Sequence, residues 1–267
     1  MIFIIIPAYN EEKNISLLVP KIHSVLGPIN LEYKILVVND GSNDGTYAQC
    51  VELSRKFPLE VLSHPVNMGV GQTFLTGLKA VASRANSDDI ILLMEADSTN
   101  DPGCLQEMIL RIKEGWDIVI ASRYRKGGGY MNFPLRRKIF SLAANFLMGV
   151  FSPVEEVKDY TIFYWAYKAG LLEKAFDFWK DKFITYSGFE ANEEVLLKLR
   201  RFNPRILEVP LVYDYGLKAG KSKMRLRKSF LELIHLIVQT YIGQRRYIVA
   251  SYASCKFYSA FLWLHKM

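Results

Sequence analysis

Short apolar runs alternate with longer amphipathic segments along the first half of the chain. The runs cover residues 1–6, 33–38, 59–63, 90–95 and 118–121, and the segments that suit helices cover 11–26, 71–84 and 103–114. Runs of this length are typical of strands buried on both faces. Strands that alternate with helices predict an α/β fold, in which a mostly parallel, Rossmann-like sheet has helices on both faces.

Polar residues cluster at the ends of four predicted strands, at 7–12, 39–46, 95–101 and 122–126. Taken singly, each cluster suits an ordinary turn, because Asn, Asp, Gly and Ser favour turns. The carboxyl ends of parallel strands meet at one edge of a sheet, and ligands bind beyond that edge. Four such clusters therefore predict a binding site there.

Carboxylates stand at two of these strand ends. Glu95 and Asp97 are separated by one small residue, and Asp101 follows. Oxygen ligands of this kind suit Mg²⁺ or Mn²⁺ bridging a diphosphate, although a solvated loop is the ordinary reading of the spacing alone. Asp40 ends the second predicted strand in a glycine-bearing loop, where it can accept hydrogen bonds from a base or ribose.

The composition is that of a folded protein, with 50% hydrophobic and 13% aromatic residues among 267. It excludes disorder, and the length suits one large domain or slightly more. The three cysteines lie far apart and the four histidines form no ligand spacing with them, so neither a disulfide scaffold nor a zinc site is expected. The first apolar run lacks the charged start and cleavage site of a signal peptide.

Positive charge is concentrated near the C-terminus. Residues 200–267 carry 13 basic and 3 acidic side chains, whereas residues 1–199 carry 21 basic and 24 acidic ones. Such a region suits nucleic acid, an anionic membrane or a phosphorylated ligand, and charge alone does not choose between them. A solvated surface is the ordinary alternative.

Several motifs together resemble those of family 2 glycosyltransferases. They are Ile-Pro-Ala-Tyr-Asn-Glu at 6–11, Val-Val-Asn-Asp-Gly-Ser-Asn-Asp-Gly-Thr at 37–46, the glycine loop at 67–71, Glu-Ala-Asp at 95–97 and the segment 115–124. Later landmarks are Arg136, Arg137, Asp159, Glu190, the strand at 206–210 and the loop at 220–223. The resemblance covers about residues 1–228 and is strongest to dolichol-phosphate mannosyltransferases and bacterial polyprenyl-phosphate glycosyltransferases. It implies a GT-A catalytic domain at 1–228.

The resemblance also implies a role for individual residues. Nucleotide-sugar binding falls to Pro7, Tyr9, Glu11, Val38, Asp40, Ala96, Asp97 and Arg123. The divalent metal, Mg²⁺ or Mn²⁺, is held by Glu95 and Asp97 with Thr99 as a further ligand. Phosphate groups of the donor or acceptor are held by Arg123 and Arg137, while Ser222 and Lys223 close over the site. Asp97 and Arg123 act in catalysis by stabilising the departing diphosphate.

The implied activity is a metal-dependent, inverting transfer of a sugar resembling mannose or glucose. The donor is a nucleoside-diphosphate sugar of the GDP-mannose or UDP-glucose type, and the acceptor is a polyprenyl phosphate, dolichyl or undecaprenyl. A sugar hydroxyl of a polysaccharide or lipopolysaccharide is the alternative acceptor, and an inactive nucleotide-sugar binder is a second alternative. A hydroxyl acceptor needs a general base, for which Asp159 and Glu190 are the candidates.

Three late features bear on that acceptor. Glu190 has an ordinary alternative, a surface helix carboxylate beside Glu193 and Glu194. Trp165 and Leu217 stand where the family carries arginine, so they remove positive charge from the acceptor side.

The C-terminal part, 229–267, is expected to be helical. Its first stripe consists of Phe230, Leu233, Ile234, Ile237, Val238 and Tyr241. Packing on the catalytic domain is the ordinary role of such a stripe, and a membrane surface is the other. The stretch 247–264 has Lys256 near its middle, which favours an interfacial helix or hairpin over a span, and its aromatic residues also suit a homo-oligomer interface. These features predict an enzyme on the cytoplasmic face of a membrane, with no nucleic-acid partner.

Overall fold

A seven-stranded sheet forms the centre of the molecule, in the order β3-β2-β1-β4-β7-β5-β8. The computed structural model describes residues 1–29, 31–218, 220 and 224–240. The strands of this sheet are β1 (Ile2–Ala8), β2 (Tyr33–Asn39), β3 (Leu59–Ser63), β4 (Ile90–Met94), β5 (Ile118–Ser122), β7 (Tyr164–Lys168) and β8 (Ile206–Pro210). All neighbours are parallel except β7, which runs antiparallel to both β4 and β5. The predicted mostly parallel sheet is confirmed.

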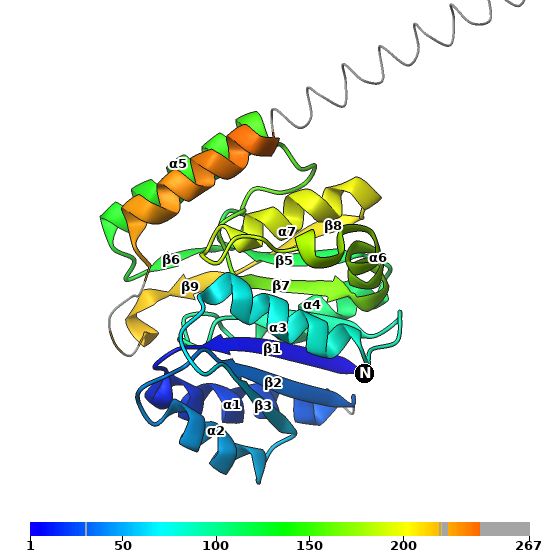
Figure 1. Ribbon diagram of the computed structural model, residues 1–267, viewed down its shortest axis with the longest axis vertical. Coiled ribbons are helices and arrows are strands. Elements are labelled where there is room, and N and C mark those ends of the chain that lie inside the picture. The colour runs from blue at the N-terminus through cyan, green and yellow to red at the C-terminus, as the bar shows by residue number, and fades with distance from the viewer. Residues whose placement is uncertain (30, 219, 221–223, 241–267) are drawn as a thin grey trace, which may run out of the picture.

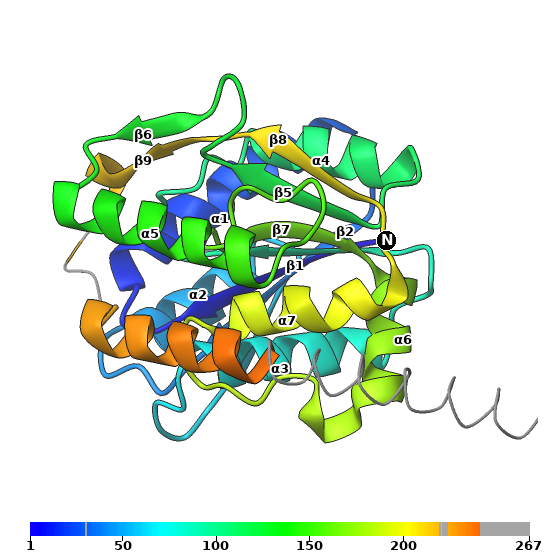
Figure 2. The same ribbon diagram turned by 90° about the horizontal axis from the view of Figure 1, so that it is seen from above.

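Helices cover both faces of this sheet, as the sequence pattern predicts (Figures 1 and 2). The helices are α1 (Glu12–Leu26), α2 (Thr46–Ser54), α3 (Val70–Ala82), α4 (Cys104–Lys113), α5 (Leu135–Phe151), α6 (Ala169–Trp179) and α7 (Ala191–Leu199). Short 3-10 turns lie at Gly27–Ile29, Lys180–Lys182, Arg200–Phe202 and Tyr215–Leu217. Helices α1 and α4 lie on one face, while α3, α6 and α7 lie on the other.

The core explains why the central strands read as unbroken apolar runs in the sequence. Ile4, Ile5 and Ile6 of β1 are fully buried, and the whole of β4 and β5 is buried as well. A strand covered by helices on both faces has no solvent side, so its residues do not alternate between apolar and polar. The same packing buries Trp165 of β7, whose indole N–H donates to the carbonyl oxygen of Ile162.

A second, smaller layer lies beyond the carboxyl ends of the strands. It consists of the two-stranded sheet of β6 (Gly129–Met131) and β9 (Val212–Asp214), helix α5 and the helix of residues 226–240. The two helices run alongside each other and meet where the rings of Phe140 and Phe230 lie 5.9 Å apart (Figure 2).

The predicted C-terminal stripe is partly confirmed. Leu233 and Ile237 are buried, Phe230 and Ile234 are half-buried, and Val238 is exposed. The rest of the predicted C-terminal segment, including 247–264, lies outside the described residues. Within the described part of the chain, none of the helices combines the length and hydrophobicity that crossing a membrane requires.

Candidate functional site

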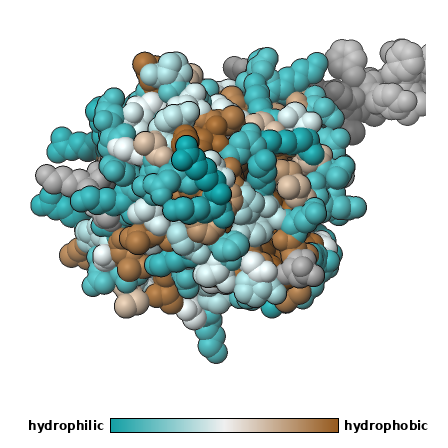
Figure 3. Space-filling model, turned by 90° about the horizontal axis from the view of Figure 1, so that it is seen from below, coloured by the Kyte–Doolittle hydropathy of each residue, from teal (hydrophilic) through white to brown (hydrophobic). Residues whose placement is uncertain are grey.

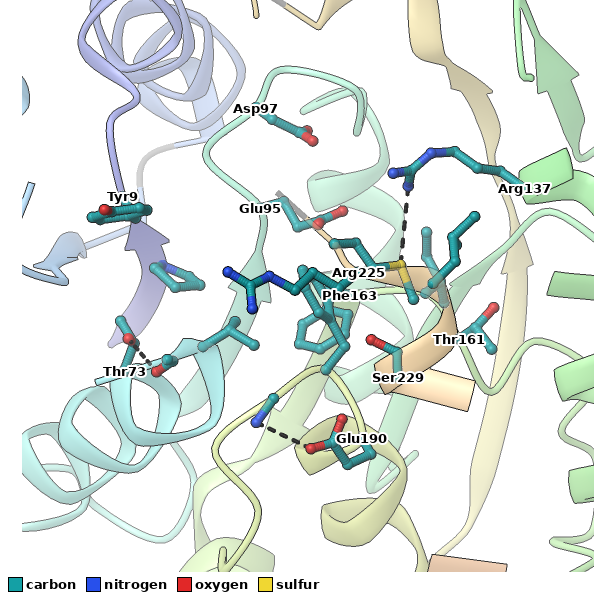
Figure 4. Close-up of a pocket in the computed structure, with 18 of the residues that line it drawn as sticks. Tyr9, Thr73, Glu95, Asp97, Arg137, Thr161, Phe163, Glu190, Arg225 and Ser229 are labelled. Atoms are coloured by element: carbon teal, nitrogen blue, oxygen red, sulfur yellow. Dashed lines mark hydrogen bonds between the residues drawn. The ribbon is translucent and has the colours of Figure 1, made fainter. Parts of the chain in front are cut away.

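The four polar clusters converge on one cavity at the carboxyl edge of the sheet. Its volume is about 770 Å³. From the clusters it is lined by Pro7, Tyr9, Glu11, Asp40, Glu95, Ala96, Asp97 and Arg123. Helix α5 contributes Arg137, the loop before α7 contributes Glu190, and residues 224–233 cover one side (Figure 4). The sequence-based prediction of a site at this edge agrees with the cavity, although Val38 is buried inside β2 and does not line it.

On one side of the cavity, Asp40 holds a loop in place. Its two carboxylate oxygens accept hydrogen bonds from the backbone N–H groups of Met68 and Gly69, each at 2.9 Å, and one oxygen lies 2.7 Å from Nδ1 of His64. Gly69 has a φ of 92°, and a Cβ there would lie 2.4 Å from the carbonyl oxygen of Ser187, so only glycine fits. The contacts seen for Asp40 are therefore those that shape the loop before α3.

The acidic pair at the end of β4 carries its own counter-charge. Asp97 is buried; one carboxylate oxygen accepts from the backbone N–H and hydroxyl of Thr99, and the other pairs with the ammonium group of Lys218. Burial and the charge of Asp97 raise the pKa of Glu95 to about 8, against the opposing effect of Lys218 and Arg123. Glu95 therefore keeps a proton near neutral pH, which a cation bound at this position would displace.

The residues at this position fit a divalent cation. Carboxylate oxygens are the ligands that Mg²⁺ and Mn²⁺ prefer, and Glu95 and Asp97 both line the cavity. In the described residues no three His, Cys, Asp or Glu side chains are grouped to hold an ion. The two carboxylates would therefore share the ion with oxygens from a ligand such as a diphosphate. Thr99 lies behind Asp97 and does not line the cavity.

Arg123 and Asp159 form a buried ion pair next to the acidic residues. The guanidinium Nε and a terminal nitrogen of Arg123 donate to the two oxygens of Asp159 at 2.8 and 2.5 Å, and the same terminal nitrogen donates to Thr161 at 2.7 Å. Asp159 is fully buried, and its backbone N–H donates to Glu208 of β8 at 2.7 Å. Because Arg123 engages both carboxylate oxygens, the structure places Asp159 as the support of Arg123 and not at the cavity surface.

The acceptor side differs from the expectation at two positions, Trp165 and Leu217. Trp165 is buried in β7, so it removes no charge from the cavity; Phe163, two residues earlier, lines it instead. Leu217 is 49% exposed, but the adjacent Lys218 reaches Asp97 and supplies a cation. Ser222 and Lys223, the predicted closing residues, lie outside the described residues.

Arg137 stands on this side of the cavity. It projects from α5 over the ring of Tyr215, with 5.7 Å from the guanidinium carbon to the ring centre. It lies across the cavity from Tyr9 (Figure 4). The structure thus brings Arg137 into one cavity with Arg123 and Lys218.

Carboxylates at the start of α7 form a feature that the sequence revealed only in part, through Glu190. The reading of Glu190 as a surface residue beside Glu193 and Glu194 is wrong, because all three are less than 6% exposed. Glu190 and Glu193 line the cavity, and Glu194 does not. Burial, opposed by backbone hydrogen bonds, raises the pKa of Glu190 to about 7 and that of Glu193 to about 8. Glu193 stands three and four residues before Leu196 and Leu197, the spacing of one helix face, and this could have signalled its burial.

Comparisons with known proteins agree with this architecture. Residues 3–176 match the family model described as Glycosyl transferase family 2. Dolichol-phosphate mannosyltransferase of Pyrococcus furiosus is 32% identical over 235 residues, which cover 87% of this chain and 62% of that protein. Polyprenol monophosphomannose synthase of Mycolicibacterium smegmatis is 36% identical over 177 residues, which cover 64% of this chain and 63% of that protein. The chain thus spans about three fifths of the length of these relatives.

Solved structures give the same fold at lower identity. Glucosyl-3-phosphoglycerate synthase from Mycobacterium tuberculosis, in complex with Mn²⁺, uridine diphosphate and phosphoglyceric acid, superposes with a TM-score of 0.62 and 17% identity. The match covers 91% of this chain and 78% of that one. At this identity the likeness shows the fold, a GT-A arrangement of a mostly parallel sheet and surrounding helices.

The buried ion pair generates a prediction about Asp159. Replacing it in Asp159→Asn leaves the Arg123 guanidinium buried without its counter-charge, so the free energy of unfolding should fall by about 3–5 kcal/mol. Urea-induced unfolding measures this. Glu156→Gln, which removes the exposed partner of Arg125, is the control and should change stability by less than about 1 kcal/mol. An Asp159→Asn variant as stable as the wild type would contradict this structural role of the pair.

Proposed function

The chain belongs to glycosyl transferase family 2, and on that premise we propose that it transfers a sugar from a nucleoside diphosphate to a polyprenyl phosphate. One observation carries the proposal: a single cavity joins the acidic pair Glu95 and Asp97 to the cations Arg123, Arg137 and Lys218. Such a cavity suits a reaction in which a diphosphate departs and a second phosphate attacks. The names of the two curated relatives support the same acceptor class.

The donor end of the cavity is the side of Tyr9, Asp40 and the acidic pair. Glu95 and Asp97 would hold Mg²⁺ or Mn²⁺, which supplies positive charge to the departing diphosphate when it is bound. The chain's own contribution is the fixed guanidinium of Arg123, which the Asp159 pair and three tyrosine rings orient before any ligand arrives. A preoriented cation stabilises developing charge without reorganising at the moment of reaction. The donor is of the GDP-mannose or UDP-glucose type.

The acceptor end favours an ionised nucleophile. A phosphate monoester is already charged at neutral pH, so attack on the anomeric carbon needs no strong base and inverts that carbon in one displacement. The structure supports this version because both oxygens of Asp159 are engaged by Arg123. A sugar hydroxyl acceptor is the second candidate, and Glu190 supports it because it lines the cavity with a pKa raised to about 7.

An apolar face of α5 supports association with a membrane surface. Leu135, Ile139, Leu142, Phe146 and Val150 are between 47% and 71% exposed, and their spacing of three or four residues places them on one side of the helix. Basic residues at 136–138 begin the same helix, which suits anionic headgroups. The opposite end of the molecule shows hydrophobic residues only in separate patches among hydrophilic ones (Figure 3). We place α5 against the cytoplasmic leaflet, from which a lipid phosphate can enter the cavity.

Transfer itself is the first test of the proposed function. Purified protein with Mn²⁺ or Mg²⁺ should move labelled sugar from GDP-mannose or UDP-glucose to dolichyl or undecaprenyl phosphate, as measured by extraction of the labelled lipid. Asp97→Asn should lower turnover roughly a hundredfold or more, because it removes charge from the metal position. Labelled saccharide without labelled lipid would contradict the lipid acceptor and favour a hydroxyl acceptor.

The ion pair between Lys218 and Asp97 gives a prediction about metal binding. Lys218 competes with a cation for Asp97, so Lys218→Gln should raise the affinity for Mn²⁺ without nucleotide by about tenfold, the effect of about one pKa unit of charge interaction. Electron paramagnetic resonance of free Mn²⁺ measures this directly. Lys79→Gln, which removes an exposed pair with Asp181, is the control. A weaker affinity in Lys218→Gln would show that the lysine assists the metal and does not compete with it.

The exposed face of α5 predicts vesicle binding. Phe146→Asp should weaken the affinity of the full chain for phosphatidylcholine and phosphatidylglycerol vesicles, measured by co-sedimentation, by about thirtyfold, because one buried aromatic side chain contributes about 2 kcal/mol. Leu110→Asp on α4 changes a similarly exposed leucine away from this face and should have no effect. Equal loss in both variants, or none in Phe146→Asp, would contradict docking through α5.

A further inference from the structure

Two carboxyl groups in the cavity have a buried oxygen that receives no hydrogen bond. Glu190 is 3% exposed and Glu193 is 5% exposed, and among the described residues no donor reaches Oε2 of either one. The other oxygen of Glu190 accepts from the backbone N–H of Gly188 at 3.1 Å. Buried polar atoms are nearly always paired, so these two oxygens call for a ligand that donates hydrogen bonds.

The neighbouring Glu194 shows what a structural carboxylate looks like in the same helix. It accepts hydrogen bonds from the backbone N–H and hydroxyl of Thr185 at 2.8 and 2.5 Å, from the backbone N–H of Tyr186 at 3.1 Å, and pairs with Lys198 at 2.6 Å. Glu194 is also buried but does not line the cavity. The helix therefore satisfies the carboxylate that faces the protein and leaves oxygens of the two cavity-lining ones unpaired.

Carboxyl groups predominate around the pair. Glu232, from the helix of residues 226–240, also lines the cavity, and its charge contributes, after burial, to raising the pKa of Glu190. Lys228 lines the cavity as well and lies 3.4 Å from Glu232, so one cation partly offsets the carboxyl groups at this end. Arg123, Arg137 and Lys218 line the cavity too, and Glu190 lies across it from Asp97 and Arg137 in Figure 4, with Phe163 between them. The cavity thus has a phosphate end and a carboxyl end.

Aromatic rings complete the carboxyl end. Phe163 and Phe189 line the cavity with their ring centres 5.6 Å apart at 82°, and Phe163 stacks on Phe74 at 4.9 Å and 9°. This packing fixes the Phe163 ring as a rigid apolar wall. A ring compound with apolar C–H faces and hydroxyl groups at its edge matches such a wall beside hydrogen-bond acceptors.

We propose that Phe163, Phe189, Glu190 and Glu193 form the subsite for the sugar that is transferred, with the two carboxyl groups accepting hydrogen bonds from its hydroxyl groups. The proposal rests on the proposed function and deepens it, since it assigns the transferred sugar to four named residues at the carboxyl end of the cavity. It predicts a pyranose with free hydroxyl groups as the transferred unit. The same groups could also bind a saccharide acceptor. The experiment below distinguishes the sugar of the donor from a saccharide acceptor.

Calorimetric titration tests the subsite. GDP and GDP-mannose, and UDP and UDP-glucose, are titrated with Mn²⁺ into the wild-type protein and the Glu190→Gln and Glu193→Gln variants. For the pair that binds, the affinity of the nucleotide sugar relative to its nucleoside diphosphate should fall roughly tenfold in each variant, because an amide group replaces one acceptor oxygen and a hydrogen bond to the sugar is lost. Affinity for the nucleoside diphosphate alone should be unchanged. Glu114→Gln, an exposed residue after α4, is the matched control.

The outcomes separate failure of the subsite from failure of the proposed function. If no nucleotide binds, the proposed function fails and the subsite fails with it. If nucleotides bind but the relative affinity is the same in all variants, the subsite alone is overturned. Loss of binding of methyl mannoside or methyl glucoside, with the nucleotide-sugar ratio intact, would assign the carboxylates to an acceptor and also overturn it. Circular dichroism of each variant confirms that an affinity change does not come from unfolding.

Discussion

The buried pair of Arg123 and Asp159 is the contact on which the geometry of the cavity depends. Arg123 leaves the carboxyl end of β5, while Asp159 precedes β7 and is held in turn by Glu208 of β8. The pair therefore ties three neighbouring strands together at the edge where ligands would bind. Tyrosine rings from the small sheet, Tyr130 and Tyr213, close over the same guanidinium. This ion pair fixes the position of the Arg123 guanidinium, because moving either partner would leave the other as a buried, unpaired charge.

Much of this architecture was predictable from local pattern. The apolar runs located five strands of the sheet, and the polar residues after four of them located the cavity, because the carboxyl ends of parallel strands share one edge. The resemblance to family 2 glycosyltransferases also predicted strand β8 and the positions of Arg137, Asp159 and Glu190. Strand β7 was not predicted from pattern, because its insertion between β4 and β5 depends on contacts between segments more than 40 residues apart.

The site was less predictable than the fold, because the role of a polar residue depends on the side chains and backbone groups that it contacts. Asp40, Asp159 and Glu190 look alike in the sequence, yet Asp40 shapes a loop, Asp159 orients an arginine and Glu190 faces the cavity. Lys218 was missed because it stands one residue from the position where the family pattern has arginine. Glu193 was missed because burial of a charged residue in a helix depends on what packs against that helix. Each of these assignments depends on contacts between residues far apart in the sequence, which only the structure shows.

The antiparallel strand β7 has a consequence for how the protein is made. Residues 1–122 provide the acidic pair and Arg123's strand, but β5 must leave room between itself and β4 for a strand that is synthesised about 40 residues later. Asp159, the cavity-lining carboxylates of α7 and the covering segment 224–233 all follow in the chain. During synthesis the emerging N-terminal half therefore exposes a gap in its sheet and unpaired strand edges, which are prone to aggregation. Among the described residues the cavity is completed late, because a nascent chain can close its site only after residues 224–233 have left the ribosome.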